Sequence, residues 1–340
     1  MLHEVWLWIK EKIALGFQRL GAALRRLWRF FLGYLATVSG STWRKVAVAL
    51  PVLFFLYILI GMAISYRVDD RLYVNTAQDS GAPQTVATVI YLVEREAKLN
   101  NWTANDPVFL PGWWLDNTPN FQKGILGALS RFTFELRDQI GRTRGSSAVD
   151  VDIEKAAGNL SKEPDRWIMD FSTSLLPTTP SDAYFREGAR QLTSYVERLK
   201  RGDAVYETRG DNLLATFDRI ALDLGASSAA LESYIEDNAG GVLPDRGADD
   251  LFYQIKGQVY AYSLLLRALK HDFSGVIEDK DLGKVYDQLI VSMDAAASLD
   301  PLVVTNGSID GMLANHLAMQ GFYLLRARTQ IREVSNILLK

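Results

Sequence analysis

Residues 46–66 form an unbroken apolar run, VAVALPVLFFLYILIGMAISY, that contains no charged residue. Arg44 and Lys45 precede this run, and Arg67 follows it. A bilayer core about 30 Å thick is crossed by a helix of about 20 apolar residues at about 1.5 Å per residue. The run therefore predicts one transmembrane helix. We expect an uncleaved anchor, because a signal peptide has a shorter apolar core nearer the N-terminus.

The charge of the chain changes sign across this run. Residues 1–45 carry a net charge of +6, and the remaining residues carry −9. Lys and Arg are enriched on the cytoplasmic side of membrane helices. We therefore predict a cytoplasmic N-terminus and an exported region over residues 67–340.

The N-terminal arm also shows features of a membrane-binding segment. Its apolar residues recur three or four positions apart, which places them on one helical face: Phe17, Leu20, Leu24, Leu27, Phe31 and Tyr34. Basic residues and tryptophans occupy the other positions, as in helices that lie in the headgroup plane. We favour a passive amphipathic anchor; the alternative is lipid sensing or the docking of a cytoplasmic partner.

The exported region has the periodicity of helices throughout. After a polar stretch over 67–83, apolar stripes with helical spacing begin near positions 86, 121, 185 and 252, and glycines 141 and 202 end two of them. Alternating β-branched runs are nearly absent from the sequence. We predict an all-α fold: an amphipathic N-terminal helix, one transmembrane helix and a multi-helix exported domain.

The last segment repeats an apolar residue every seven positions, at Leu317, Leu324, Ile331 and Leu338. Such a seam is typical of coiled coils. We favour packing within the chain, along a helix such as 249–270; the alternative is a homo-oligomer through this C-terminal helix.

The unusual region is the Trp-rich loop, residues 99–122, LNNWTANDPVFLPGWWLDNTPNFQ. Three prolines prevent a regular helix, and the aromatic content is too high for a solvated linker. One interpretation is a ligand groove, lined by Asp106, Trp113, Trp114 and Asp116, in which tryptophans stack on glycan and carboxylates act as acid and base. The other is a structural plug, which we favour because buried large aromatics are mostly packing. Asn117 or Thr118 is then expected to cap a helix that begins at Pro119.

A second loop, over residues 141–152, combines Arg142 and Arg144 with Ser146 and Ser147. Placed before a helix N-terminus, these residues suit an anion. We favour a simpler explanation, in which one of the serines is the N-cap and the acidic residues after it occupy the first turn.

Other chemistry is sparse. The chain has no cysteine, which excludes disulfides, thiolate metal ligands and a cysteine nucleophile. The three histidines show no metal-binding spacing, and we predict no metal or other cofactor. The acidic charge of the exported region argues against nucleic acid as a partner.

The runs DPVFLPGWWLDNTPNFQKG and GRTRGSSAVDVDIEKAA closely resemble a proteobacterial inner-membrane family known as domain of unknown function 2333. The resemblance covers nearly the whole chain. It implies a single-span, largely helical envelope protein and no particular reaction, so it assigns no catalytic residue.

Together these observations predict four segments: a cytoplasmic basic arm (1–45), a transmembrane helix (46–66), a linker (67–83) and a helical periplasmic domain (84–340). We predict a structural or interaction protein of the bacterial inner membrane, whose partners are the bilayer and another envelope protein or cell-wall component. The candidate binding residues are those of the two loops: Asp106, Trp113, Trp114, Asp116, Asn117, Arg142 and Arg144. The alternative is an enzyme that binds or cleaves cell-wall glycan with Asp106 or Asp116.

Overall fold

The computed structural model describes Arg29, Gly33 and residues 42–72, 81–142, 149–170, 174–238, 246–301, 303–307 and 314–340. The chain divides into two units, Met1–Ile60 and Gly61–Lys340. The second is called the helical unit below. The amphipathic arm predicted for residues 1–45 lies mostly outside the described residues and stays a prediction.

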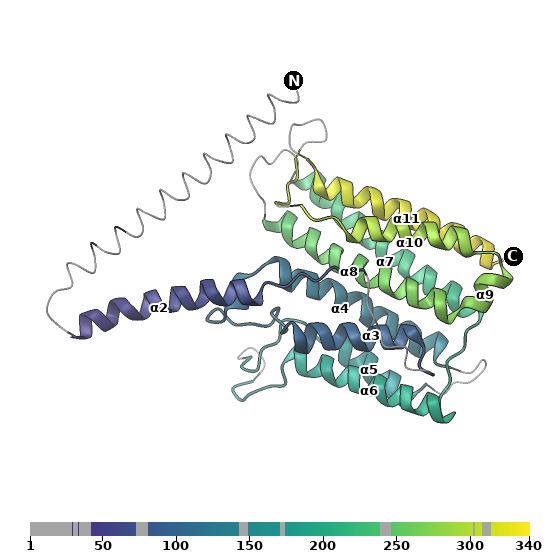
Figure 1. The fold of residues 1–340 in the computed structure, drawn as a ribbon, viewed down its shortest axis with the longest axis horizontal. Coiled ribbons are helices and arrows are strands. Elements are labelled where there is room, and N and C mark those ends of the chain that lie inside the picture. The colour runs from purple at the N-terminus through teal and green to yellow at the C-terminus, as the bar shows by residue number, and fades with distance from the viewer. Residues whose placement is uncertain are drawn as a thin grey trace, which may run out of the picture. The chain divides into compact units, whose positions relative to one another are not determined.

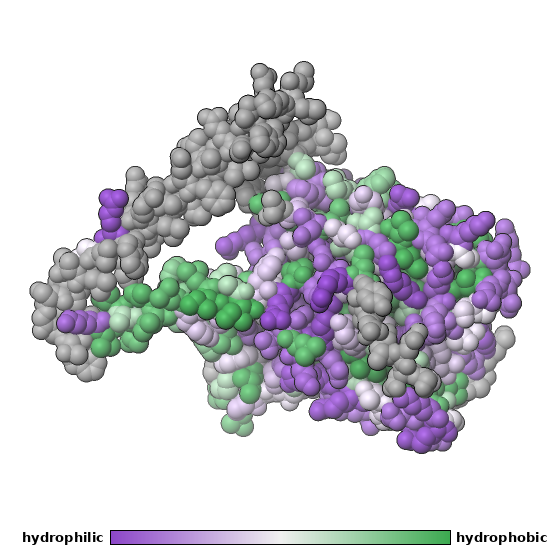
Figure 2. All heavy atoms as spheres, in the orientation of Figure 1, coloured by the Kyte–Doolittle hydropathy of each residue, from purple (hydrophilic) through white to green (hydrophobic). Residues whose placement is uncertain are grey.

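Helix α2 (Thr42–Ser65) covers the apolar run. Its segment Lys45–Ser65 has a mean hydropathy of 2.6, and within the described part of the chain it is the one helix long and apolar enough to cross a membrane. Figure 2 shows the hydrophobic surface of α2, where side chains such as Leu50, Leu53 and Phe55 are exposed. A core helix of a soluble protein buries such side chains, so the exposure fits a membrane-spanning helix.

The helical unit is built from antiparallel helices (Figure 1). In chain order they are α3 (Gln84–Glu94), α4 (Asn117–Glu135), α5 (Val151–Leu160), α6 (Ser181–Arg201), α7 (Gly210–Asp237), α8 (Arg246–Asp272), α9 (Ser274–Asp279), α10 (Gly283–Ala297) and α11 (His316–Leu338). Short π-helical turns, Arg95–Leu99 and Leu136–Ile140, extend α3 and α4. The predicted all-α fold is confirmed: the described elements are helices, besides one isolated bridge between Asn306 and Asn315.

Helix α8 is the centre of the helical unit. It packs against α3 and α4 on one side and against α7 and α10 on the other, and most of its residues are buried. The backbones of α4 and α8 approach closely at Gly124 and Gly257. A Cβ on Gly124 would lie 1.9 Å from the Gln254 carbonyl oxygen, and one on Gly257 would lie 2.1 Å from that of Phe121. Glycine therefore permits this crossing.

The predicted helical stripes are confirmed as core faces. Phe121, Ile125 and Leu129 of α4 are buried, as are Phe252, Val259 and Leu266 of α8. Helix α6 ends at Arg201, before Gly202 in a left-handed conformation, with φ of +80°.

The seam of α11 is also buried within the chain, although not mainly against residues 249–270. Leu317, Leu324, Ile331 and Leu338 face α7 and α10, whereas α8 makes few contacts with α11. Helix α8 is already enclosed by α3, α4, α7 and α10, which leaves α11 in the outer layer.

Two predicted helix starts are wrong by a few residues. Helix α4 begins at Asn117, and Asp116 is its N-cap, accepting a hydrogen bond from the Asn117 N–H. Helix α5 begins at Val151 after Asp150, whose carboxylate accepts from the N–H groups of Asp152 and Ile153 at 3.0 and 3.3 Å. In both helices an aspartate is the N-cap, where we had expected a neighbouring Asn, Thr or Ser. Asp, Asn, Ser and Thr are all favoured as N-caps, so the sequence does not distinguish them.

Because consecutive long helices run in opposite directions, the starts of α4, α6, α8 and α11 lie at the same end of the helical unit (Figure 1). We call it the proximal end. Hydrogen bonds join its elements: Asn120 Nδ2 in α4 donates to Asp250 in α8 at 2.7 Å, and Asn306 Nδ2 donates to the Asn238 carbonyl after α7 at 3.2 Å. The Trp-rich loop belongs to this end.

Candidate functional site: the Trp-rich loop

The first half of the Trp-rich loop is fixed to the core. Trp102 is only 6% exposed, packs edge to face on Phe185 at 4.9 Å, and donates from Nε1 to the Pro164 carbonyl at 2.8 Å. The fully buried Gln122 accepts from the Thr103 N–H at 3.0 Å and donates to the Asn101 carbonyl at 2.9 Å. For Trp102 the predicted structural plug is confirmed.

The second half of the loop faces outward. Residues Pro111–Trp114 form a 3₁₀ turn, in which Trp113 is 52% exposed and Trp114 is 48% exposed. The two rings contact each other edge to face at 5.1 Å, and Trp114 Nε1 donates to the Val108 carbonyl at 2.9 Å. The plug interpretation is therefore wrong for these two tryptophans: the indole N–H of Trp114 is satisfied inside the loop, and about half of each residue is exposed.

Asp106 lies behind this turn. Burial raises the pKa of its carboxyl to about 6, and the nearby Asp182 adds to the rise, while a hydrogen bond from the Gly112 backbone N–H opposes it. Asp182 itself forms an ion pair with Arg186 at 2.5 Å.

Asp116 and Asn117 belong to a different group of side chains, at the starts of α4 and α8. Burial, then the charges of Asp116 and Asp250, raise the pKa of Asp249 to about 6. The Asn117 side-chain amide lies 2.5 Å from Asp249 and 2.9 Å from Asp116, and with its NH₂ toward them it donates to both. The enzyme interpretation paired Asp106 with Asp116, but each of them has other carboxylate neighbours: Asp182 for Asp106, and Asp249 for Asp116.

The second candidate loop lies elsewhere. Arg142 follows the π-helical turn that ends α4, and Arg144 lies outside the described residues. Residues 117–140 separate Arg142 from the Trp-rich loop by a helical length of about 36 Å. The structure therefore does not bring Arg142 together with Asp106, Trp113, Trp114 or Asp116. Asp150 and Asp152, at the end of this loop, both pair with Arg198, at 2.6 and 2.8 Å.

Gly61 lies against the Trp-rich loop, and the chain that leaves α2 is hydrogen-bonded to the start of α4. A Cβ built on Gly61, in the last turns of α2, would lie 2.1 Å from Cγ of Pro111. The Arg67 N–H donates to Thr118 Oγ1 at 3.2 Å. Close approach of Pro111 thus requires a glycine at position 61.

Two aspartates then bind this chain to buried cations. Asp70 pairs at 2.7 Å with Lys256, which is fully buried on α8, and Asp69 lies 3.9 Å from the buried Arg95. Tyr260 donates to the Arg71 carbonyl at 3.0 Å. Residues 67–72, predicted as the start of a linker, are thereby fixed to the helical unit; residues 73–80 lie outside the described part of the chain. We call residues 67–72 the strap; its attachment was not predicted, although the pair Asp69 and Asp70, three residues after the apolar run, was its visible signal.

Apolar side chains beyond the tryptophans are exposed at the proximal end. Val108 and Phe109 belong to the Trp-rich loop, and Ile168, Leu175 and Leu176 belong to the loop between α5 and α6. Leu175 reaches 85% exposure. The two loops touch where Phe109 packs edge to face on Trp167 at 5.4 Å.

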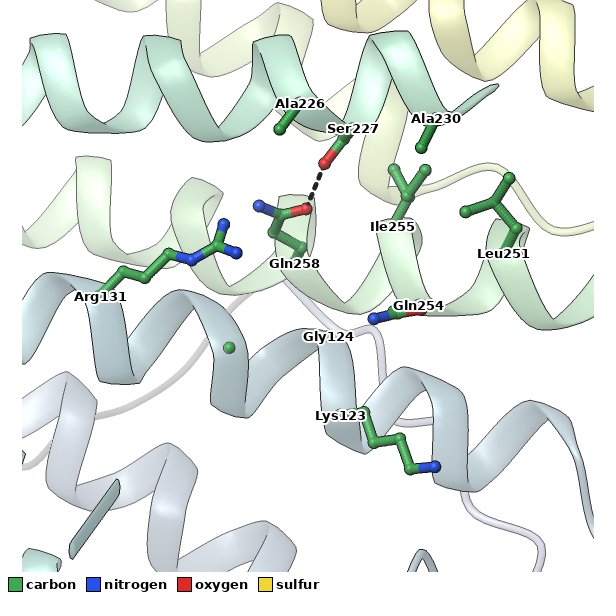
Figure 3. A pocket seen from close by; sticks show the side chains of 11 residues that line it. Lys123, Gly124, Arg131, Ala226, Ser227, Ala230, Leu251, Gln254, Ile255 and Gln258 are labelled. Atoms are coloured by element: carbon green, nitrogen blue, oxygen red, sulfur yellow. Dashed lines mark hydrogen bonds between the residues drawn. The ribbon is translucent and has the colours of Figure 1, made fainter. Parts of the chain in front are cut away.

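A pocket of about 210 Å³ lies between α4, α7 and α8 (Figure 3). The charged side chains beside it have partners within the chain: Lys123 pairs with Asp165 at 2.6 Å, and Arg131 pairs with Asp223 at 3.0 Å. At its base, Ser227 donates to Gln258 at 2.6 Å. The residues that line this pocket include none of the seven candidate residues.

These features define a helical protein in which one helix, apolar and long enough to cross a membrane, continues directly into a unit of packed antiparallel helices. The chain belongs to the family described as an uncharacterized protein conserved in bacteria, domain of unknown function 2333, whose model matches residues 39–240 and 244–340. The resemblance seen in the sequence is thereby confirmed. None of the curated proteins and none of the solved structures compared with the chain matches it.

Proposed function

We propose that this protein is a single-pass protein of the bacterial inner membrane that holds its helical unit in the periplasm and acts there by binding another envelope component. The observation that carries the proposal is the apolar helix α2 with its exposed side chains, and the residues that follow Ile60 are fixed within the helical unit. Pro111 contacts Gly61 of α2, and Asp70 binds the buried Lys256 only a few residues after α2 ends.

The orientation in this proposal rests on charge. The +6 of residues 1–45 favours the cytoplasmic side, where Lys and Arg are enriched, and the acidic remainder is free to cross. The family is conserved in bacteria, so the proposal takes a bacterial cell as the source. The exported region then crosses the cytoplasmic (inner) membrane and lies in the periplasm.

The partner surface that we propose is the outer face of α11. Because Leu324 and the rest of the heptad seam are buried, the seam is already used inside the chain. The opposite face exposes Met319, Phe322 and Leu325, three apolar side chains at helical spacing. Aromatic and aliphatic side chains gathered on one face are the usual core of a protein interface. We expect another envelope protein there, with a second copy of this chain as the alternative.

A reporter fusion tests the topology. Alkaline phosphatase fused after Lys340 should be active, because this enzyme requires export, and a β-galactosidase fusion at the same point should be inactive. The mature protein should keep residues 1–45. An active β-galactosidase fusion, or a mature N-terminus near Tyr66, would contradict the proposal.

Cysteine chemistry tests the partner surface, since the chain has no cysteine of its own. In native membranes, Leu325→Cys carrying a photo-crosslinker should give a discrete adduct, and Glu333→Cys, also exposed on α11, should give less of it. An adduct of twice the chain's mass would identify a second copy. Equal amounts of diffuse crosslinked products from both positions would contradict the proposal that α11 is the partner surface.

A glycan-directed function is the second candidate, and a specific observation favours it. Trp113 and Trp114 are exposed rather than buried, beside the start of α4, where Asp249 has a pKa of about 6 next to Asp116. A carboxyl with a raised pKa beside a second carboxyl is the kind of pair that acid–base glycan cleavage uses. Incubation of the full chain in detergent with purified cell-wall glycan tests it: release of fragments that Asp249→Asn abolishes would replace the binding proposal with an enzyme.

A further inference from the structure

The depth of the Trp-rich loop along α2 is set by one contact. Pro111 touches Gly61, and α2 continues to Ser65. Four further residues of helix rise about 6 Å. Pro111 therefore lies level with the last turn of the apolar helix, and Trp113 and Trp114 follow it within the same 3₁₀ turn. If α2 spans a bilayer, this level is the boundary between the acyl chains and the headgroups, the interface at which tryptophan and tyrosine are enriched in membrane proteins.

The composition of the exposed surface points to lipid. Besides the two tryptophans it includes the aliphatic side chains of Val108, Leu175 and Leu176, which have no stacking face to offer a sugar. Figure 2 shows a hydrophobic patch over the loops at the lower left of the helical unit. Several large apolar side chains left exposed on neighbouring loops mark an interaction surface. Tyr66, also exposed, adds an aromatic ring at the end of α2.

The loops are also built to present these side chains rather than to bury them. Trp102 and Gln122 fix the base of the Trp-rich loop to the core, and the contact between Phe109 and Trp167 joins its outer part to the second loop. Trp114 has its Nε1–H bonded to Val108, so its ring enters an apolar layer without an unsatisfied donor.

We propose that the proximal end of the helical unit is seated on the lipid surface, with Trp113 and Trp114 in the headgroup layer beside the exit of α2 and with Val108, Leu175 and Leu176 at the boundary of the acyl chains. The proposal rests on the membrane anchoring argued above and adds a second point of membrane attachment. The occupant of this apolar surface is phospholipid, because Pro111, in the same 3₁₀ turn as Trp113 and Trp114, contacts Gly61 near the end of the anchor itself.

Single-cysteine labelling of the full chain in phosphatidylcholine vesicles tests the proposal. An environment-sensitive fluorophore is placed at Val108→Cys and at Leu175→Cys, so that both tryptophans remain. Leu56→Cys, within α2, reports whether the anchor is inserted, and Leu222→Cys, exposed midway along α7, is the matched control. Lipids that carry a spin-label quencher near the headgroup or deep in the acyl chain report the depth of each fluorophore.

We expect shallow quenching at positions 108 and 175, deep quenching at 56 and none at 222. Deep quenching at 56 with no quenching at 108 and 175 would overturn the lipid seat and leave the membrane anchor intact. No quenching at 56 would overturn the anchor, and the lipid seat with it.

A second variant separates the tryptophans from mere proximity to the bilayer. Changing Trp113→Ser and Trp114→Ser together in the Val108→Cys background should lower the quenching at position 108, while the deep quenching at 56 stays unchanged in its own background. Circular dichroism checks that the variant keeps its helical content. Unchanged quenching in a folded variant would show that the tryptophans do not hold the loop at the surface.

Discussion

Trp102 and the pair Trp113 and Trp114 belong to the same loop and have opposite environments. Trp102 is 6% exposed, with its ring against Phe185, whereas Trp113 and Trp114 are about half exposed and contact each other. The loop therefore has an inner half that stabilises the core and an outer half that presents side chains. Residue type alone does not distinguish the two roles.

Helix α11 shows the same division on a regular element. Leu324 is fully buried against the neighbouring helices, whereas Phe322 and Leu325, on either side of it, are about 60% exposed. In the Trp-rich loop and in α11, some apolar residues are buried in the core, whereas apolar residues close to them in sequence are exposed. We therefore expect substitutions of the buried residues to lower the stability of the fold, and substitutions of the exposed residues to leave it nearly unchanged.

The largest effect is expected on α11. Leu324→Asp places an unpaired charge in the core, at a cost of several kcal/mol, so the helical unit should lose its fold. Phe322→Asp, its matched control on the exposed face, should stay folded. Circular dichroism and protease resistance of the full chain in mild detergent measure both. If the Leu324→Asp variant stayed folded, the heptad seam of α11 would not be part of the core.

The next effect concerns the loop. Trp102→Ala should lower the free energy of unfolding by about 3–5 kcal/mol, as for other buried large aromatics, because it leaves a cavity beside Phe185. Trp114→Ala should change it by less than about 1 kcal/mol. Thermal unfolding in detergent compares the two variants. Equal destabilisation would mean that the outer half also supports the core, contrary to its exposure.

A smaller effect is expected for the strap after α2. Asp70→Asn removes the closest partner of the buried Lys256 and should cost about 2 kcal/mol, below the usual loss for a buried pair because Asp70 is partly exposed. Asp300→Asn is the control: this carboxylate lies 3.3 Å from the same ammonium but is largely exposed, and its loss should cost less. If Asp300→Asn lowered stability more than Asp70→Asn, the main partner of Lys256 would be Asp300 and not Asp70 of the strap.

The smallest effect concerns the carboxylates beside the outer half. The pKa of Asp249 is about 6 in the folded chain and about 3.9 in an unfolded one. A raised acid pKa gives a stability contribution that is complete below about pH 4 and is lost as the pH rises through about 6. Asp249→Asn should therefore raise stability at pH 7.5 by about 0.5 kcal/mol, discounted because the group is partly exposed. The melting temperatures of the variant and the parent should differ at pH 7.5 and become equal near pH 4. A difference that stays constant between these pH values would contradict the raised pKa of Asp249.

The sequence by itself determined the apolar helix, the all-α class and most core faces. Each of these depends on a local period or on local composition: a run over residues 46–66, or stripes such as Phe121, Ile125 and Leu129 spaced for one helical face. Burial on one side of a helix imposes that spacing wherever the helix packs, so the pattern is visible without knowledge of the partner helix.

Only the tertiary structure decided which helix covers the α11 seam, which tryptophans are buried, and where Asp69 and Asp70 bind. These outcomes depend on residues distant in sequence: Trp102 is buried because Phe185 and Pro164 lie against it, and Asp70 is bonded because Lys256 of α8 faces it. No local period encodes such a meeting. The separation of Asp106 from Asp116 has the same origin, since each carboxylate takes its neighbours from a different later helix, Asp182 from α6 and Asp249 from α8.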